Sequence, residues 1–145
     1  MTVGDYMREA LKEAEAALLA GEVPVGAVVA KDGAIIARAG NRCERDKDPT
    51  AHAELLAIRE AARSTGDWRL EGCTLYATLE PCCMCAGAIK NARLSRVVFG
   101  AYDAANGCCQ SRADITALGC AAKIIGGVLA DECAALLSKC FIETR

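Results

Sequence analysis

The sequence is short of histidine, of aromatic residues and of long apolar runs, and each shortage narrows what the protein can be. Its 145 residues include one His, two Phe, three Tyr and one Trp. A single histidine, His52, excludes any site built from several imidazoles. No apolar run approaches the ~18 residues of a membrane-spanning helix. The first residues show no basic segment followed by an apolar stretch, as a secretory signal would. We therefore expect a cytoplasmic protein without a membrane partner.

The overall charge is nearly balanced, but one stretch of the chain has no acidic residue. The net charge is −2 and the hydrophobic content 53%, which indicates one globular domain over residues 1–145 rather than a strongly basic nucleic-acid binder. Residues 81–102 nevertheless lack Asp and Glu and contain Lys90, Arg93 and Arg96. This basic strip is either a surface for phosphates or a solvated helix end.

Cysteine is abundant, with ten residues. An even count suits a disulfide framework in a small secreted protein, but nothing here indicates secretion, so we expect reduced thiols. Four of them occupy apolar positions and are predicted to lie in the core: Cys73, Cys120, Cys133 and Cys140. The adjacent Cys108 and Cys109 fit pocket lining, a redox-sensitive spot or small loop residues, and we favour the last.

The hydrophobic periodicity predicts alternating helices and strands. Helices are expected from an N-cap at Asp5 to Gly21, then over residues 51–65, 83–92 and 129–141. Strands are expected over residues 23–30, 34–39, 73–79, 96–100 and 123–125, the first two joined by a hairpin turn at residues 31–33. Residues 101–122 give no clear pattern. The order predicts an α/β fold, a mixed sheet with helices on both faces.

Three residues have the spacing and chemistry of a zinc site: His52, Cys82 and Cys85. Three protein ligands leave the fourth tetrahedral position open for water, which is typical of catalytic zinc. Cys82 and Cys85 lie one helical turn apart, so both thiols face the same way. Glu54, two residues after the histidine, is placed to carry a proton, provided that His52 lies at the start of its helix.

Each part of this pattern has a simpler interpretation. A lone C-x-x-C is often redox-active or half of a zinc knuckle, and a structural site could take Cys83 or Cys43 as a fourth ligand. The combination of H-x-E with P-C-x-x-C about 30 residues later is much more specific, because it is the signature of zinc-dependent nucleobase deaminases. We therefore predict one catalytic Zn²⁺ per subunit.

The chain resembles the bacterial tRNA-specific adenosine deaminases, within the cytidine and deoxycytidylate deaminase superfamily. The matching segments cover almost its whole length: residues 23–28, 41, 48–54, 78–82, 84–88, 96–101 and 127–133. The resemblance implies a three-layer α/β/α cytidine-deaminase-like fold with a central mixed sheet of about five strands. It also implies a homodimer that converts the wobble adenosine of a tRNA anticodon to inosine.

The same resemblance assigns roles to individual residues. It makes His52, Cys82 and Cys85 the zinc ligands and Glu54 the proton carrier. Substrate-binding positions follow from it alone: Val25, Asn41, Ala53 and Asp103.

Two other functions remain open at this point. Residues 103–114 depart from the family pattern, and together with the acidic composition this favours, as the alternative, a deaminase of a free nucleobase or nucleoside such as guanine or cytosine. A zinc-stabilised binding module without activity is the third hypothesis. Glu54 argues against it, because a structural zinc site has no use for a proton carrier.

Overall fold

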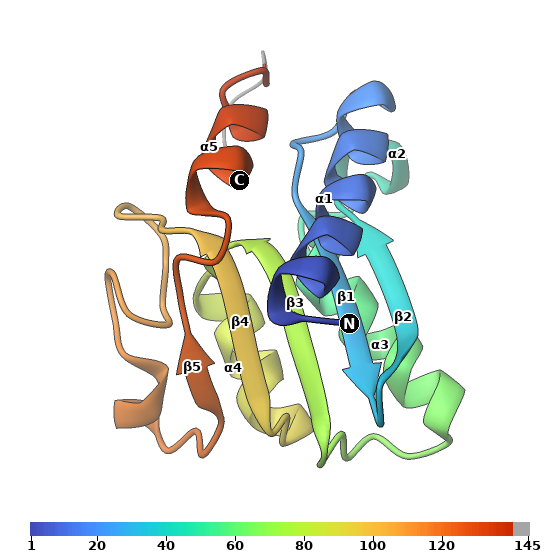
Figure 1. Ribbon diagram of the computed structural model, residues 1–145, viewed down its shortest axis with the longest axis vertical. Coiled ribbons are helices and arrows are strands. Elements are labelled where there is room, and N and C mark those ends of the chain that lie inside the picture. Colours follow the sequence, from blue (N-terminus) through green and yellow to red (C-terminus); the bar gives the residue numbers. More distant parts are fainter. Residues whose placement is uncertain (141–145) are drawn as a thin grey trace.

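A mixed five-stranded sheet forms the centre of the computed structural model, which describes residues 1–140 (Figure 1). The strand order is β2-β1-β3-β4-β5, where β1 runs antiparallel to β2 and β3 while β3, β4 and β5 run parallel. The strands are β1 (Gly26–Lys31), β2 (Ala34–Gly40), β3 (Cys73–Leu79), β4 (Arg96–Ala101) and β5 (Lys123–Ile125). The helices are α1 (Val3–Leu19), α2 (Cys43–Asp46), α3 (Ala53–Thr65), α4 (Cys83–Ala92) and α5 (Ala130–Leu137).

Helices cover both faces of this sheet, as Figure 1 shows. Helices α1 and α5 lie in front of it, and α3 and α4 lie behind it. The core between the layers is built from fully buried side chains on helices and strands alike, among them Met7, Leu75, Ile89 and Phe99. The predicted three-layer α/β/α fold with a mixed sheet is therefore confirmed. Among the described residues, no helix combines the length and the apolar character needed to cross a membrane.

Turn residues account for the boundaries that the sequence predicted well. Asp32 and Gly33 both have positive φ, at 52° and 79°, which is what a two-residue hairpin turn requires. Gly66 ends α3 in the left-handed conformation with φ 74°. The strand at residues 73–79, the helix at 83–92 and the strand at 123–125 are confirmed with the expected limits.

Two expectations about helix ends were wrong, and one loop contains a short helix. The N-cap of α1 is Thr2, while Asp5 occupies the third helical position and completes a capping box with it. The loop after β2 contains the short helix α2, and the last helix ends at Leu137 instead of at residue 141. Phe141, with which the predicted helix closes, lies outside the described residues. In the unassigned stretch 101–122, the structure has turns and one 3-10 turn, Ile115–Leu118.

The topology brings several loops to one end of the sheet, where the carboxyl ends of β3 and β4 lie. Parallel strands β3 and β4 end there, β1 begins there and β2 ends there. In α/β sheets ligands bind outside the carboxyl ends of the parallel strands. The segments that follow β2 and β3 and precede α3 and α4 therefore meet at the place where a site is expected.

Candidate metal centre

His52, Cys82 and Cys85 meet at the N-termini of two neighbouring helices. One ligand atom from each lies within 4.8 Å of the others. The His52 Nδ1 atom is 3.5 Å from the Cys82 Sγ atom and 3.6 Å from the Cys85 Sγ atom. His52 is the N-cap of α3, Cys82 is the N-cap of α4, and Cys85 lies in the first turn of α4. The structure thus joins the three residues that the sequence singled out.

This donor set suits zinc. One imidazole nitrogen and two thiolates are borderline to soft ligands, and three of them leave a tetrahedral ion one open position. Among residues 1–140, the cluster of possible ligands contains no fourth member. Cys83 is instead bonded to another cysteine, and the Cys43 Sγ atom lies 3.7 Å from the Asn41 side-chain amide nitrogen. The arrangement favours the open, catalytic type of site.

The electrostatics of the site favour thiolates. The pKa of Cys82 is lowered to about 3, first by its hydrogen bond with the Cys85 side chain and then by His52, against the opposing effect of burial. The positive ends of the α3 and α4 dipoles point at the same place. A cation bound there would find at least one ligand already deprotonated at neutral pH.

Glu54 is fully buried in the first turn of α3, two residues beyond the N-cap His52. The sequence required His52 to lie at the loop junction if both residues were to serve one site, and it does. A buried carboxylate on the first turn also lies at the positive end of the helix dipole.

A pocket of about 390 Å³ opens beside the ligands. Its lining combines residues of the centre itself with the segment that follows β4: His52, Cys82, Cys83, Met84, Ala105, Asn106 and Arg112. The sequence did not single out Asn106 or Arg112. The sequence showed only that residues 103–114 depart from the family pattern. That departure points to the segment but does not tell which of its side chains face the pocket.

The four substrate positions lie in the surrounding segments. The backbone N–H of Asn41 donates to the carbonyl of Val25 at 3.1 Å, so these two are neighbours at the edge of the sheet. Asn41 is 1% exposed, and its side-chain oxygen has no hydrogen-bond partner among the described residues. Ala53 is buried directly after His52. Asp103 is half-buried, and its carboxylate accepts the backbone N–H groups of Ala105 and Asn106.

The expectation of reduced thiols is wrong for one pair. Cys83 and Cys108 are joined by a disulfide across a Cα–Cα distance of 5.1 Å. The reason is that the segment after β4 folds back onto the start of α4, where the Cys108 N–H donates to the Pro81 carbonyl at 2.9 Å. Cys108 and Cys109 are also buried, and burial raises the pKa of the Cys109 thiol to about 12.

The predicted core cysteines are largely confirmed. Cys73, Cys120 and Cys133 are buried in the core cluster, and Cys140 is partly buried against it.

The basic strip does not border the metal ligands. Lys90 and Arg93 lie at the C-terminal end of α4, whereas the ligands are at its N-terminus, roughly 10 Å or more away at ~1.5 Å per residue. Arg93 stacks over the ring of Trp68 at 5.1 Å. Arg96 is half-buried and donates to the Tyr76 hydroxyl at 3.5 Å. Helix geometry thus separates residues that are close in sequence, and Arg112 is the cationic residue that lines the pocket.

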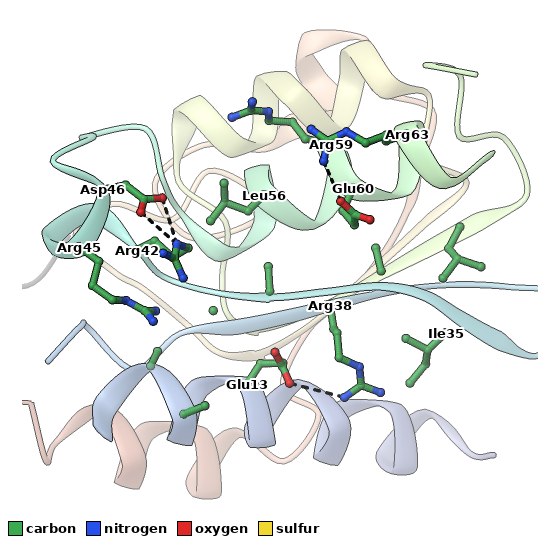
Figure 2. Close-up of a pocket in the computed structure, with 16 residues that line it drawn as sticks. Glu13, Ile35, Arg38, Arg42, Arg45, Asp46, Leu56, Arg59, Glu60 and Arg63 are labelled. Carbon is green, nitrogen blue, oxygen red and sulfur yellow. Dashed lines mark hydrogen bonds and ion pairs between the residues drawn. The ribbon is translucent and has the colours of Figure 1, made fainter. Parts of the chain in front are cut away.

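A larger hollow on another part of the surface does not belong to this centre. This cavity has a volume of about 830 Å³ and is lined by residues of α1, β2, α2 and α3, and by none of the three ligands. Figure 2 shows its lining residues. Several of its arginines face acidic partners. The pairs are Arg38–Glu13, Arg42–Asp46 and Arg63–Glu60, with N···O distances of 3.0–3.5 Å. These three pairs neutralise part of the positive charge of the lining, which also includes Arg45 and Arg59.

Comparison with known proteins places this centre in a family. The family model of the cytidine and deoxycytidylate deaminase zinc-binding region matches residues 2–101. The chain belongs to this deaminase family. The tRNA-specific adenosine deaminase of Bacillus subtilis is 49% identical over 143 residues, which is 97% of this chain and 89% of that protein.

Solved structures of deaminases share the fold. One, from a study of A-to-I editing by tRNA:A34 deaminases, superposes with a TM-score of 0.88 at 43% identity, covering 91% of this chain and 98% of that one. Guanine deaminase from Bacillus subtilis superposes with a TM-score of 0.69 at 38% identity, covering 83% of this chain and 71% of that one. The resemblance stated from the sequence is confirmed. The chain is a zinc-dependent deaminase with the cytidine-deaminase-like fold, and the predicted zinc cofactor is confirmed with it.

Proposed function

We propose that this deaminase converts the wobble adenosine of a tRNA anticodon to inosine, with release of ammonia. The observation that carries the proposal is the open His52, Cys82 and Cys85 centre in a chain that is 49% identical, over almost its whole length, to a tRNA-specific adenosine deaminase. The anticodon stem-loop is the partner that this function requires. A base in a stem-loop can be turned out of its stack into a pocket, as other nucleobase deaminases require.

In this proposal His52, Cys82 and Cys85 hold the metal, and Glu54 carries the proton. Zinc, when bound, supplies the Lewis acidity that activates water for attack on an amidine carbon. The Glu54 carboxylate would carry the two protons of the attacking water in turn. The first goes to the ring nitrogen, and the second, released as the carbonyl forms and the C–N bond breaks, goes to the amine, which leaves as ammonia. The full burial of Glu54 keeps bulk water from competing for the proton.

Four residues are proposed to hold the nucleoside. The buried and unpartnered side-chain oxygen of Asn41 supports this assignment, since a ligand donor would relieve the cost of an unpaired acceptor. Val25 and Ala53 are fully buried, directly before β1 and at the start of α3, and are proposed to contact the base from these two elements. Asp103 lies on the segment that carries the pocket-lining Asn106, so it is placed to meet a group next to the base.

The test is ammonia release by the zinc-loaded protein, offered an adenosine-containing anticodon stem-loop beside a panel of free bases and nucleosides. Turnover of the stem-loop, with inosine found at the wobble position, is the expected result. A stem-loop with guanosine at that position is the matched control and should release nothing. Turnover of small heterocycles alone would overturn the tRNA proposal.

A deaminase of a free nucleobase is the second candidate. Similarity to the guanine deaminase structure and the altered residues 103–114 favour it, because that segment forms one wall of the pocket. The zinc motif does not discriminate between the two, since both reactions attack a carbon of an amidine. The substrate panel above separates them.

We also propose that the protein is a cytoplasmic homodimer. The similarity to tRNA-specific adenosine deaminases supports both the dimer and the location. Light scattering of the purified chain tests the dimer: a mass near twice 15.2 kDa is expected, and a monomer at micromolar concentration would contradict it.

A further inference from the structure

The segment 103–112, called here the pocket loop, forms a wall of the candidate site although it contains no helix or strand. Two of its residues, Asn106 and Arg112, line the pocket together with His52 and Cys82. A loop of this kind needs contacts from elsewhere to stay in one conformation, because its own periodic hydrogen bonds are few.

Those contacts converge on one side chain. Glu80 follows the last residue of β3, is 1% exposed, and directs its carboxylate at the backbone of the pocket loop. Its Oε2 atom accepts the N–H groups of Cys109, Gln110 and Ser111 at 3.2, 2.8 and 2.8 Å. Its Oε1 atom accepts the N–H of Asp103 at 3.1 Å and the hydroxyl of Ser111. The two ends of the pocket loop are thus tied to the same carboxylate.

The loop is also shaped to receive this carboxylate. A Cβ atom on Gly107 would lie 2.3 Å from the Glu80 carboxyl carbon and 2.6 Å from the Asp103 carbonyl oxygen. Real Cβ atoms do not approach other atoms so closely. Glycine at position 107 therefore makes room for the Glu80 carboxylate, which the backbone of the pocket loop surrounds.

A carboxylate satisfies the hydrogen-bond donors around this position better than any other side chain of its size. Each of the surrounding groups is a donor, and an ionised carboxylate is an acceptor with about four lone-pair sites and no hydrogen of its own. Hydrogen bonds to a charged acceptor are also stronger than neutral ones. A glutamine would turn one oxygen into an amide that meets backbone N–H groups with its own hydrogens.

We propose that Glu80 is a positioning residue for the deamination, which fixes the pocket loop at the mouth of the metal centre and thereby sets substrate affinity. The proposal rests on the proposed function for its substrate, but the structural half stands on the hydrogen bonds alone. Glu80 neither lines the pocket nor supplies a metal ligand. Its effect must therefore reach the substrate through Asp103, Asn106 and Arg112.

The experiment compares the zinc-loaded wild type with Glu80→Gln, Glu80→Asp and Gly107→Ala. All samples contain a thiol reductant, so that the Cys83–Cys108 bond does not hold the loop in place of Glu80. Hydrogen exchange is measured at the amides of residues 103 and 109–111. We expect exchange there to accelerate by roughly tenfold to a hundredfold in Glu80→Gln, as the loss of charged hydrogen bonds implies. Gly107→Ala should show the same pattern without any change to the carboxylate.

Kinetics supply the second measurement. The KM for the anticodon stem-loop should rise by roughly tenfold in Glu80→Gln while kcat changes by less than about threefold, since binding contacts are lost and the proton carrier is untouched. Glu80→Asp keeps the negative charge on a shorter side chain, so it should bind the stem-loop more tightly than Glu80→Gln and less tightly than the wild type. Zinc content, measured in each sample, should equal that of the wild type.

Glu22→Gln is the matched control. Glu22 is also 1% exposed, and its carboxylate also accepts two backbone N–H groups, those of Glu44 and Arg45 at 3.0 and 2.8 Å. Its loss should release the amides of residues 44 and 45 and leave those of residues 109–111 protected. A general loosening of the protein by loss of any buried carboxylate would release both sets.

The outcomes separate this proposal from the proposed function. Unchanged protection of residues 109–111 in Glu80→Gln would overturn the positioning role, and so would a fall in kcat with KM unchanged. Zinc loss with the loop still protected would also overturn it, because Glu80 would then act on the neighbouring ligand Cys82. Released amides in a protein whose wild type turns over no stem-loop would overturn the tRNA function and leave the loop assignment standing.

Discussion

At the scale of single residues, the sequence alone singled out the three residues that cluster as candidate metal ligands, because their chemistry is rare in the chain. One histidine leaves no choice of imidazole, and a C-x-x-C spacing places two sulfurs on one helical turn. Asn106, Arg112 and Glu80 could not be predicted in this way. Asn106 and Arg112 lie on a loop that folds back from β4 onto the start of α4, and Glu80 acts through its hydrogen bonds to that loop. No local spacing encodes these contacts.

Glu54→Gln should separate metal binding from proton transfer. The amide is nearly the same size as the carboxylate but does not accept a proton at neutral pH, so turnover should fall by a factor of about 10² to 10⁴. Zinc content should remain equal to that of the wild type, since Glu54 is not among the clustered ligands. Ammonia release and metal analysis on the same sample check both statements.

Glu60→Gln provides the control for this substitution. Glu60 lies on the same helix but is exposed and paired with Arg63, so its removal should leave turnover unchanged. Activity that survives in Glu54→Gln at the wild-type level would show that the proton carrier has been assigned to the wrong residue.

Cys133→Ala should change how stability depends on alkaline pH. Burial raises the pKa of the Cys133 thiol to about 11 from an ordinary value near 9.0. Between these values the unfolded thiol ionises and the folded one keeps its proton, so unfolding releases a proton and rising pH favours it. The free energy of unfolding of the wild type should therefore fall more steeply, by up to about 1.4 kcal/mol per pH unit.

Urea titrations at intervals from pH 8 to 11 measure this slope in both proteins. Cys133→Ala lacks the titrating group, so its free energy of unfolding should fall less steeply with pH, by the contribution of one proton. This holds whatever its stability at pH 8. Parallel curves would mean that the folded thiol ionises as readily as the unfolded one.

At the scale of elements, the sequence predicted those helices and strands whose pattern and boundaries are both local. Strand β3 has the predicted limits because its apolar run ends at a polar residue. Helix α4 has the predicted limits because its helical periodicity ends at residue 92. The N-cap of α1 was misassigned because Thr2 and Asp5 are both good capping residues. Residues 101–122 had no prediction, because beyond the end of β4 they contain only one short 3-10 turn, and residues 103 and 109–111 bond to Glu80 instead.

Gly26→Ala should loosen the contact between α1 and β1. A Cβ at this position would lie 2.1 Å from the Ala10 carbonyl oxygen and 2.5 Å from the Ala14 nitrogen, both in the α1 backbone. Helix backbone does not yield locally, so α1 must move away from the sheet, and we expect a loss of about 1–3 kcal/mol or more in the free energy of unfolding.

Urea unfolding of Gly26→Ala beside Gly4→Ala tests this steric argument. The nearest atom to a Cβ on Gly4 is the Thr2 Oγ1 atom at 3.7 Å, an ordinary contact within α1. Gly4→Ala should keep or slightly raise stability, because alanine favours a helix. Equal stability of the two variants would mean that α1 does not approach β1 as closely as described.

At the scale of the whole molecule, most of the positive charge of the basic strip lies away from the candidate metal centre. The chain has a net charge of −2, so any affinity for RNA must come from local groups rather than from the overall field. The basic residues at the end of α4 lie far from the ligands, while Arg112 lines the pocket. In the proposed function, the contact of this pocket with RNA draws on Arg112, which the pocket loop carries.

The metal should contribute to the stability of the whole fold, because it links two helices whose ligands are 30 residues apart. An ion that binds the folded state alone stabilises it by about 2.7 kcal/mol when its free concentration is 100 times the Kd. Removing zinc with a chelator should therefore lower the melting temperature of the wild type. Cys85→Ala lacks a ligand from the buried side of the centre, so it should melt at a lower temperature and respond little to the chelator. A wild type that loses its zinc and melts at the same temperature would show that the α3 and α4 N-termini are held together by packing alone, and that the metal serves only the chemistry.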